Sequence, residues 1–519
     1  DNVMKVLFVF PNYDCPIGIS IGVSYLSAIL KEKGHITKII HINEQINYCF
    51  DIERIISDAK DFEPTLVAIS VGENHYKDMC ELVKRMKTEI DAKYCMGGIH
   101  ITINAYQVMG EINELDYCIL GDGEEPLIEL VDSLEEKEDV TNIPNVWVRK
   151  GTKIIKNRMR PLKQMFSLPS MDLEGWQFDK ITQMRHGWIN VSMNRGCPYR
   201  CSYCHNIAEV KVLQENFGTK GTSNKELGYL RLRDVDDMIR ELRDIKTKYP
   251  YIKEISFIDD TFTFNKEHML NFFKKYAQEI GLPFVCLTTV NDLDEELLDA
   301  MKDANCDMIR FGVESASENI RKKIIRRNFS NEKMYKVFQM CKDRGIRTFA
   351  YNMIAHPGET KDEIISTLKV NAELKPEGVR ISLGYPYKGT LYYEIANEMG
   401  LIDNSKEFHN YSTDTKFIFS QEDRLWIDKV RLYFKWWLNM FLENESSEIY
   451  HGLIAELEKI TYEKWNDEST RKKISIKDKE VSEMLKNNNI EHYTSPYYER
   501  PDIIILYKAG SIMIRRDEL

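Results

Sequence analysis

The sequence predicts an α/β fold in three parts: an N-terminal doubly wound parallel sheet, a central partial (β/α) barrel and a C-terminal mainly helical region. Three observations predict it. Short apolar runs alternate with amphipathic segments from residue 4 to about 130, a second alternating series begins near residue 186, and aromatic-rich helical patterns replace the alternation beyond about residue 400. Strands that alternate with helices are typical of parallel sheets covered by helices.

The first series predicts strands with helices between them, at Val6 to Phe10, Ile36 to His41, Leu66 to Ser70, Lys93 to Met96 and Tyr117 to Leu120. A doubly wound sheet binds its ligand at the carboxyl ends of its strands. Small and polar residues stand at those ends, as Pro11-Asn12-Tyr13-Asp14, Ser70-Val71-Gly72-Glu73, Gly97-Gly98-Ile99-His100 and Gly121-Asp122-Gly123-Glu124. Because glycine permits close approach, these successive loops indicate a flat, extended ligand.

The segment from Asn142 to about Arg185 has no sustained period and contains three prolines, which predicts a linker. The second series then predicts strands at Ile189 to Asn194, Glu254 to Ile258, Phe284 to Thr289, Met308 to Gly312, Arg347 to Ile354 and Val379 to Leu383. These β/α units fit a partial barrel of the TIM type, whose active site also lies at the strand carboxyl ends. The expected domains are therefore 1–140, a linker at 141–185, the barrel at 186–400 and a helical domain at 401–519.

The C-terminal part has a helical pattern at Arg424 to Glu443, which carries Trp426, Trp436 and Trp437. An aromatic stripe at helical spacing predicts a helix that is packed in a core. A terminal strand pair is expected at Ile503 to Tyr507 and Ser511 to Arg515.

Composition narrows the class of protein. A chain of 519 residues, with 43% hydrophobic and 29% charged residues, is expected to fold into about two to four domains. The formal net charge of -11 gives no field that attracts a polyanion, so we expect a small-molecule, peptide or protein substrate and no nucleic acid. The apolar stretch Lys5 to Phe10 is short and is followed by Asn12 and Asp14, so neither a signal peptide nor a membrane span is predicted, and the cytoplasm is the expected location.

The cysteines point to metal chemistry at one place. Of the 11 cysteines, three stand in Arg195-Gly196-Cys197-Pro198-Tyr199-Arg200-Cys201-Ser202-Tyr203-Cys204, directly after the first barrel strand, and the others are scattered. A [4Fe-4S] cluster normally takes four protein thiolates, so three leave one iron open to another ligand. The alternative is structural zinc, which needs four ligands in paired spacing. Only His205 is near as a fourth ligand, and its adjacency to Cys204 makes it a poor one.

On these residues the sequence resembles the radical SAM superfamily, whose Cys-x3-Cys-x2-Cys motif it matches, with the aromatic Tyr203 before the last cysteine. The resemblance implies a [4Fe-4S] cluster held by Cys197, Cys201 and Cys204. Its open iron would chelate S-adenosylmethionine, which reduction cleaves to a 5'-deoxyadenosyl radical. Further matches at strand ends are Ile258-Asp259-Asp260-Thr261-Phe262, Gly312-Val313-Glu314-Ser315-Ala316-Ser317 and His356-Pro357-Gly358-Glu359-Thr360. By the same resemblance Tyr203, Asp260, Glu314 and Ser315 lie near the cofactor.

An N-terminal doubly wound domain before such a barrel is similar to the cobalamin-binding class of the superfamily. This similarity implies a Rossmann-like cobalamin-binding domain with a site lined by strand-end residues, namely Ser70, Gly72, Gly97, Gly98, His100, Gly121, Gly123 and Glu124. The Asp-x-His-x-x-Gly motif, which supplies a lower axial histidine in other cobalamin proteins, is absent from this sequence.

The expected function is a methyltransferase that acts on an unactivated carbon by way of the 5'-deoxyadenosyl radical and methylcobalamin, with an electron donor such as flavodoxin or ferredoxin. A cyclase or ring-rearranging enzyme of the same architecture is an alternative, and so is a non-catalytic cobalamin or iron-sulfur sensor. A methylthiotransferase would need three further cysteines from the N-terminal set, which is Cys15, Cys49, Cys80, Cys95 and Cys118. No single catalytic residue and no particular substrate can be named from the sequence.

Overall fold

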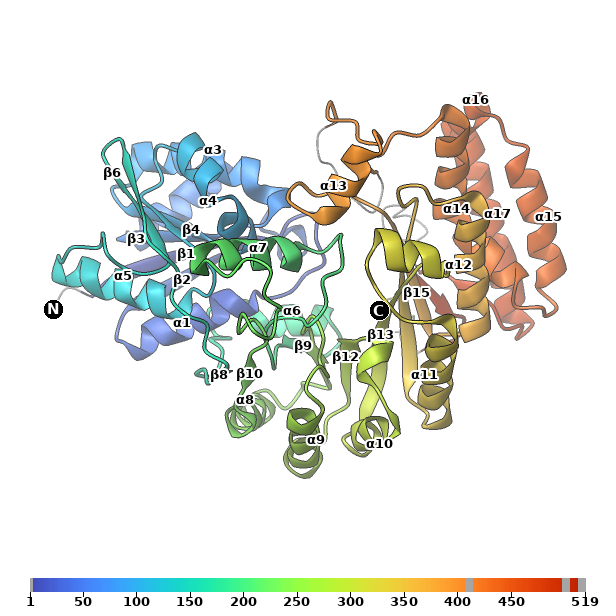
Figure 1. Cartoon of the computed structure of the whole chain (residues 1–519), viewed down its shortest axis with the longest axis horizontal. Coiled ribbons are helices and arrows are strands. Elements are labelled where there is room, and N and C mark those ends of the chain that lie inside the picture. The colour runs from blue at the N-terminus through green and yellow to red at the C-terminus, as the bar shows by residue number, and fades with distance from the viewer. Residues whose placement is uncertain (1–2, 407–413, 497–504, 512–519) are drawn as a thin grey trace. The chain divides into compact units, whose positions relative to one another are not determined.

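The computed structural model describes residues 3–406, 414–496 and 505–511 (Figure 1). The chain divides into two compact units. The first unit comprises Asp1–Pro198, His205–Asp260 and Lys275–Leu282, and the second comprises Tyr199–Cys204, Thr261–Lys274 and Pro283–Leu519. The barrel strands are therefore shared between the units, with the first two in the first unit.

The first unit contains the predicted doubly wound sheet. Its parallel strands run in the order β2-β1-β3-β4-β5, and the reversal of order at β1 marks the edge where such sheets bind ligands. The strands are β1 (Lys5–Pro11), β2 (Ile36–Ile42), β3 (Leu66–Ser70), β4 (Lys93–Gly97) and β5 (Tyr117–Ile119), and the helices between and after them are α1 (Ile21–Glu32), α2 (Ile52–Phe62), α3 (Tyr76–Glu89), α4 (Ile99–Glu111) and α5 (Glu124–Glu136). Helices α1 and α5 pack together on one face, and α3 and α4 cover the other (Figure 1). All five predicted strands are confirmed.

The linker prediction is wrong for residues 146–156. There β6 (Val146–Lys150) and β7 (Lys153–Lys156) form an antiparallel hairpin, and β6 pairs with β5, so the hairpin extends the first sheet. Its turn uses Gly151 with φ of 62°, a conformation that favours glycine. The prolines that suggested a linker lie outside both strands. The rest of the segment contains β8 (Met165–Phe166) and α6 (Phe178–Met184).

Two barrel strands belong to the first unit. Strands β9 (Trp188–Val191) and β11 (Glu254–Phe257) pair in parallel, as predicted. The chain between them forms α7 (His205–Phe217), β10 (Leu232–Arg233), which pairs with β8, and α8 (Val235–Lys248). Helix α7 packs against α4, so the segment after the cysteine motif is fixed to the first sheet's own layer of helices.

The second unit contains the remaining predicted barrel strands, which pair successively in parallel. They are β12 (Phe284–Thr288), β13 (Cys306–Glu314), β14 (Arg347–Ile354) and β15 (Gly378–Leu383), and the helices of this series are α9 (Lys266–Glu279), α10 (Glu295–Asp303), α11 (Asn331–Asp343) and α12 (Lys361–Leu374). Strand β17 (Ile505–Lys508) pairs with β15 and with β16 (Tyr493–Thr494), both antiparallel. In the predicted terminal strand pair, residues 503 and 504 of the first strand lie outside the described residues. All of the second strand except Ser511 also lies outside them.

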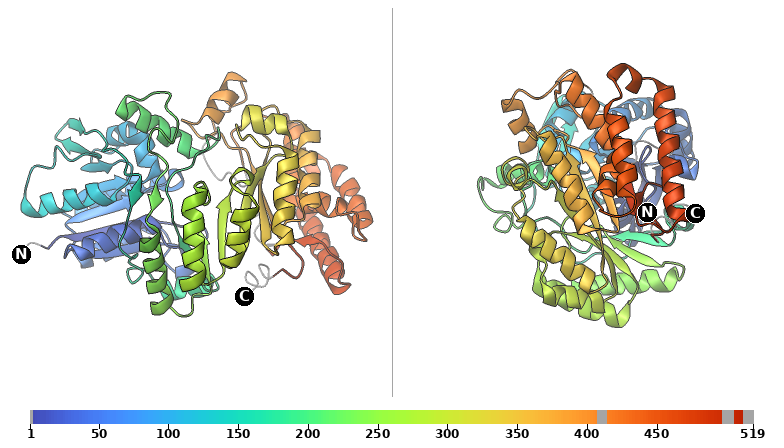
Figure 2. Two further views of the ribbon diagram at one scale, coloured as in Figure 1. Left: turned by 60° about the horizontal axis from the view of Figure 1, so that its bottom comes forward. Right: turned by 90° about the vertical axis from the view of Figure 1, so that its right-hand side faces the viewer.

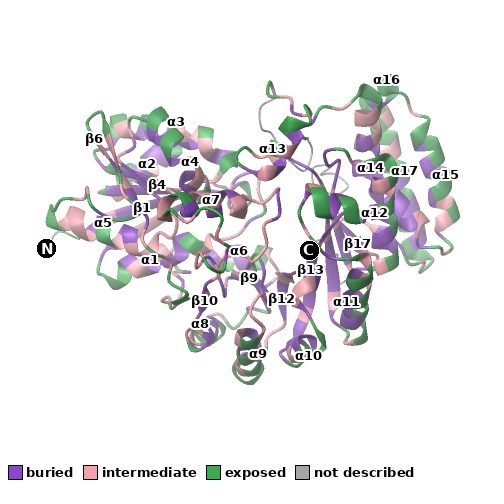
Figure 3. Ribbon diagram, viewed as in Figure 1, coloured by how far each residue is buried: buried purple, intermediate pink, exposed green. Residues whose placement is uncertain are grey.

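The C-terminal region is mainly helical, as predicted, with α13 (Leu391–Glu398), α14 (Gln421–Met440), α15 (Ser447–Glu458), α16 (Tyr462–Trp465) and α17 (Glu468–Asn487) (Figure 2, orange and red). Helix α14 packs on α12 and α15. Its Trp436 and Trp437 are buried, which confirms that the aromatic stripe is helix core (Figure 3). Within the described residues, no helix is both long and apolar enough to cross a membrane.

Candidate functional site

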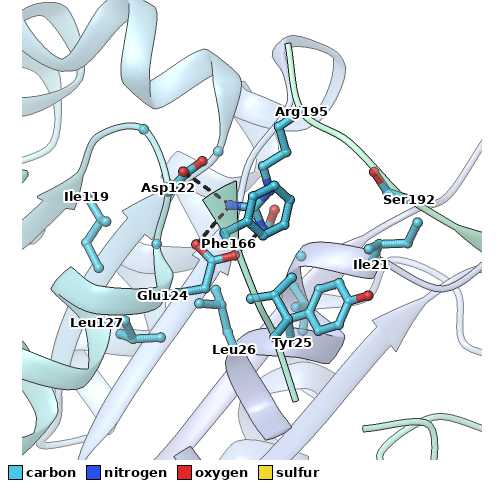
Figure 4. Close-up of a pocket in the computed structure, with 18 of the residues that line it drawn as sticks. Ile21, Tyr25, Leu26, Ile119, Asp122, Glu124, Leu127, Phe166, Ser192 and Arg195 are labelled. Carbon is cyan, nitrogen blue, oxygen red and sulfur yellow. Dashed lines mark hydrogen bonds and ion pairs between the residues drawn. The ribbon is translucent and has the colours of Figure 1, made fainter. Parts of the chain in front are cut away.

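A cavity of about 450 Å³ opens at the carboxyl edge of the first sheet, entirely within the first unit (Figure 4). Seven of the residues predicted from the sequence line it: Ser70, Gly97, Gly98, Gly121, Gly123, Glu124 and Asp260. Helix α1 contributes a further wall through Gly22, Tyr25 and Leu26, which the sequence reasoning had not singled out. The glycine-rich loops after β4 and β5 therefore converge on one site, as predicted.

The glycines of this edge serve two purposes. Gly98 has φ of 105°, and a Cβ there would lie 3.0 Å from the Val71 carbonyl oxygen, so the backbone itself requires glycine. Gly97 lacks that constraint, because a Cβ there would make only ordinary contacts, at 3.6 Å or more. At Gly22 no heavy atom lies within 4 Å of the position a Cβ would take. Gly97 and Gly22 thus leave space that a side chain would fill.

Two predicted residues lie elsewhere. Gly72 and His100 are not among the residues that line the cavity. Gly72 begins a short 3-10 helix, Glu73–His75, and His100 packs its ring against Tyr76 at 4.4 Å. Burial, followed by the charge of His205, lowers the pKa of His100. The helical turn at the start of α4 directs this side chain away from the edge that the preceding glycines form.

An ion-pair network that the sequence did not predict lies in the cavity wall. Arg195 contacts Asp122 at 3.2 Å and also pairs with Glu124, while Arg231 pairs with Asp122 (Figure 4). The Arg195 guanidinium also lies over the Phe166 ring, 4.8 Å from its centre. Burial acts to lower the pKa of Arg195, but the charges of Glu124 and Asp122 outweigh it and raise the pKa above its ordinary value. Arg195 is therefore held as a cation.

The cysteine motif follows β9 on a loop whose first part is rigid. Gly196 has φ of 85°, and a Cβ there would lie 2.0 Å from the Tyr229 carbonyl oxygen, so no other residue fits. The Cys197 carbonyl accepts a hydrogen bond from Asn224 at 2.8 Å. In the second unit, the Cys204 amide donates to the Cys201 carbonyl at 3.1 Å, which closes a turn between these cysteines. Burial raises the pKa of the Cys201 thiol, and the nearby Arg327 opposes that shift.

The second unit brings together Tyr203 and Glu314, both predicted from the sequence. The Tyr203 hydroxyl donates to the Glu314 carboxylate at 3.0 Å, and Arg327, which was not predicted, contacts the same oxygen at 3.4 Å. Glu314 is buried, stands at the irregular end of β13 and has φ of 66°. Burial raises its pKa, and Arg327 and Tyr203 offset only part of the shift. A strained, buried carboxylate of this kind is typical of a functional site.

Ser315 follows Glu314 directly and connects this site to the motif after β14, which runs from His356 to Thr360. Its hydroxyl donates to Glu359 at 3.3 Å, and Glu359 also accepts from the His356 amide at 3.0 Å. Burial raises the pKa of Glu359 to about 8 and lowers that of His356 to about 4. In the sequence both residues stand out only as members of the motif that runs from His356 to Thr360, because a short motif shows nothing of burial.

The paired aspartates after β11 have different surroundings. Asp259 is buried and accepts from the backbone amides of Met193 and Asn194, so it fixes the end of β9. Asp260, the predicted site residue, accepts from Asn206 at 2.9 Å and lines the cavity. Burial raises the pKa of both carboxyls, that of Asp259 to about 7.

Comparison with known families identifies both parts of this site. The radical SAM superfamily model matches residues 191–370, and the B12 binding domain model matches residues 16–131. The chain carries a radical SAM domain and a B12 binding domain. The implied cofactors are a [4Fe-4S] cluster, S-adenosylmethionine and cobalamin.

Relatives span most of the chain. An uncharacterized methyltransferase of Pyrococcus horikoshii is 28% identical over 78% of this chain and 86% of its own length. An anaerobic magnesium-protoporphyrin IX monomethyl ester cyclase of Cereibacter sphaeroides is 23% identical over 79% of this chain and 66% of its own. Among solved structures, the radical S-adenosylmethionine methyltransferase TsrM of Kitasatospora setae, with cobalamin and a [4Fe-4S] cluster bound, has a TM-score of 0.64 at 18% identity, covering 78% of this chain and 81% of that one. The last likeness shows a shared fold.

The residues present fit these cofactors. Three thiols on one short loop of the radical SAM domain form the donor set that a site-differentiated cluster requires. In the B12 binding domain, Gly22 and Gly97 leave space in the cavity that a side chain would fill, which suits a large ligand.

We expect Gly22→Leu to weaken cobalamin binding about tenfold or more, because a side chain there would enter the cavity. The helix itself should gain stability, since leucine favours helices by roughly 0.8 kcal/mol over glycine. Gly110→Leu is the matched control, because Gly110 is also on a helix with no heavy atom within 4 Å of its Cβ position and lies outside the cavity lining. Equilibrium dialysis with hydroxocobalamin measures both affinities, and equal affinities would place the ligand elsewhere.

Proposed function

We propose that this chain is a cobalamin-dependent radical SAM methyltransferase that acts on an unactivated carbon of a small molecule. The observation that carries the proposal is the first unit's cavity, whose wall joins the glycine loops of the B12 binding domain to the loop of Cys197. Support comes from the Pyrococcus horikoshii relative and from the fold shared with TsrM, both named as methyltransferases.

Each cofactor would be bound by its own set of residues. Cys197, Cys201 and Cys204 would hold the cluster, and Tyr203, Glu314 and Ser315 would lie beside S-adenosylmethionine. The cobalamin would lie against the loops that supply Ser70, Gly97, Gly98, Gly121, Gly123 and Glu124, with Asp260 on the barrel side of the cavity. When bound, the cluster and S-adenosylmethionine supply a 5'-deoxyadenosyl radical, and cobalamin supplies a methyl group.

The chain's own residues would orient and isolate this chemistry. Gly98 and Gly196 allow backbone to approach where side chains would collide. Tyr203 and Arg327 hold the Glu314 carboxylate in one orientation through two contacts to the same oxygen. The burial of Glu314 and Ser315 keeps water from this part of the barrel, which protects a reactive radical from side reactions.

The proposal also concerns partners and location. A low-potential donor such as flavodoxin or ferredoxin would supply electrons to the cluster. We place the reaction in the cytoplasm, because 11 cysteines in a chain of 519 residues do not make a disulfide scaffold and a reducing compartment suits a cluster held by thiolates.

A cyclase or ring-rearranging function is the second candidate, and the Cereibacter sphaeroides relative, named as a cyclase, favours it. The two functions share the cavity, the cysteine loop and the Glu314 site. They differ in whether a methyl group leaves S-adenosylmethionine, so their products distinguish them. A non-catalytic sensor would form neither product.

The experiment is product analysis of the anaerobically reconstituted protein with reductant, cobalamin and S-adenosylmethionine, with and without a metabolite extract. A methyltransferase should form S-adenosylhomocysteine and 5'-deoxyadenosine, and the substrate-dependent increments should be equal. If 5'-deoxyadenosine forms without S-adenosylhomocysteine and without a need for cobalamin, the methyltransferase proposal is wrong and the cyclase alternative replaces it. If neither product forms while both cofactors are bound, the sensor alternative holds.

A further inference from the structure

Four charged side chains connect the glycine edge of the B12 binding domain to the loop of Cys197. We call them the arginine bridge: Asp122, Glu124, Arg195 and Arg231. Arg195 lies 3.2 Å from Asp122 and 3.4 Å from one Glu124 oxygen, with a closer contact to the other, and Arg231 reaches Asp122 through both terminal nitrogens (Figure 4). The acidic partners follow β5, and the basic partners come from the barrel side of the same unit.

The backbone makes this connection stiff. Arg195 and Arg231 exchange both of their backbone hydrogen bonds, at 3.0 and 2.9 Å. One residue separates Arg195 from Cys197, and that residue, Gly196, is fixed against the Tyr229 carbonyl. The Cys197 carbonyl is held by Asn224. The first cysteine of the motif is therefore held on the same fixed stretch of backbone that carries Arg195.

The bridge is partly shielded from water. The side chain of Arg231 is 8% exposed, those of Glu124 and Arg195 are 17% and 22% exposed, and that of Asp122 is 40% exposed. Separation of the Arg195–Glu124 pair would leave two charges in a poorly solvated place, which is unfavourable. The same four side chains also line a second cavity of about 780 Å³. The ion pairs therefore favour movement of the two loops together.

We propose that the arginine bridge couples the two cofactor sites. A ligand that fixes the Asp122 and Glu124 loop would, through Arg195, fix Cys197 in the position that the cluster needs. Coupling of this kind is reciprocal, so cluster assembly would raise the affinity of the glycine edge for cobalamin by the same factor. Arg195 is thus a positioning residue. The inference rests on the cofactor placement in the proposed function.

The test compares hydroxocobalamin binding by the full chain before and after anaerobic reconstitution of the cluster. We expect the wild-type protein to bind about fivefold more tightly, or better, once the cluster is present. Glu124→Gln should lower that ratio about twofold or more, because Arg195 then keeps Asp122 as its acidic partner in the bridge but loses Glu124. The matched control is Glu125→Gln, because this next residue pairs with Arg160 and Lys163 and makes no contact within the bridge. The control should keep the wild-type ratio.

A spectroscopic measurement separates coupling from a general loss of structure. In the wild-type protein, hydroxocobalamin should change the electron paramagnetic resonance spectrum of the reduced cluster, whereas in Glu124→Gln the change at saturating hydroxocobalamin should be clearly smaller. Arg195→Glu combined with Glu124→Arg should restore part of the change. Should Arg195→Glu fail to fold, Glu124→Gln still decides, since Arg195 keeps Asp122 as a partner.

The outcomes are distinguishable. A wild-type ratio of one, with cobalamin bound in both states, overturns the coupling and leaves the proposed function standing. An equal decrease of the affinity ratio in Glu124→Gln and Glu125→Gln also overturns the coupling, because the effect would then not depend on the arginine bridge. Failure of the wild-type protein to bind hydroxocobalamin at all overturns the cobalamin placement and the proposed function, and the inference with them.

Discussion

Replacement of Cys197, Cys201 or Cys204 by alanine should abolish the iron-sulfur absorbance of the reconstituted protein and its cleavage of S-adenosylmethionine. Three thiolates are the whole donor set of the motif, and the cluster already has one iron without a cysteine. Each variant would open a second iron, and the two remaining thiolates would hold the cluster poorly. Iron and sulfide analysis, together with the visible spectrum under anaerobic conditions, measures the loss for each variant.

The same variants should remain folded, because none of the three cysteines has a large side chain to remove from a core. Cys49→Ala provides the control, since this exposed cysteine lies outside the motif and should leave iron content and cleavage unchanged. Any of the three variants that retained four irons with full cleavage would remove its cysteine from the proposed ligand set.

The free energy of unfolding of the wild-type protein should fall between pH 5 and 8 by roughly 3 kcal/mol through Glu359 alone. Glu359→Gln should remove this part of the fall. Burial raises the pKa of Glu359 to about 8, so the folded protein keeps this carboxyl protonated where the unfolded chain has released the proton. Stability should therefore fall as pH rises from the ordinary carboxyl range toward 8. Glutamine keeps the shape and has no proton to lose, so the variant should lack this part of the decline.

Urea unfolding of the cofactor-free protein at pH 5, 6.5 and 8, followed by tryptophan fluorescence, measures this effect. Glu363 provides a control of opposite sign. Although burial acts to raise its pKa, hydrogen bonds from the Thr360 backbone and the Ser317 hydroxyl lower it, so its stabilisation is present at neutral pH and is lost as pH falls. Glu363→Gln should therefore lose about the same stability at pH 5, 6.5 and 8, because the stabilisation by Glu363 is lost only below the ordinary carboxyl pKa. Parallel pH profiles of wild type and Glu359→Gln would contradict the assignment for Glu359.

The strands were predictable because their signal is local. Strands β3 and β14 begin and end where the apolar runs predict, and the other parallel strands differ by a few residues at their ends. Burial on both faces makes such strands continuously apolar. The hairpin of β6 and β7 escaped prediction because its second strand, Lys153–Lys156, is an edge strand with no buried residue and thus lacks the apolar run.

The candidate site was predictable in part. Glycines before α4 and α5 line the cavity, since a close approach at a strand end needs the residue type itself. Gly72 and His100 do not line it, because the direction in which a loop leaves its strand depends on the helix that follows.

The sequence alone indicated the cofactors of this protein, through its resemblance to the radical SAM superfamily and to the cobalamin-binding class of that superfamily. The three-cysteine motif marks a candidate ligand set, and alternating apolar runs predict parallel sheets by burial. Only the tertiary structure decided which charges meet. Glu124 and Arg195 are 71 residues apart, and Asp122 and Arg231 are 109 apart. No local sequence pattern predicts either pair. Such an ion pair forms only where the fold brings two distant loops together and their packing excludes water.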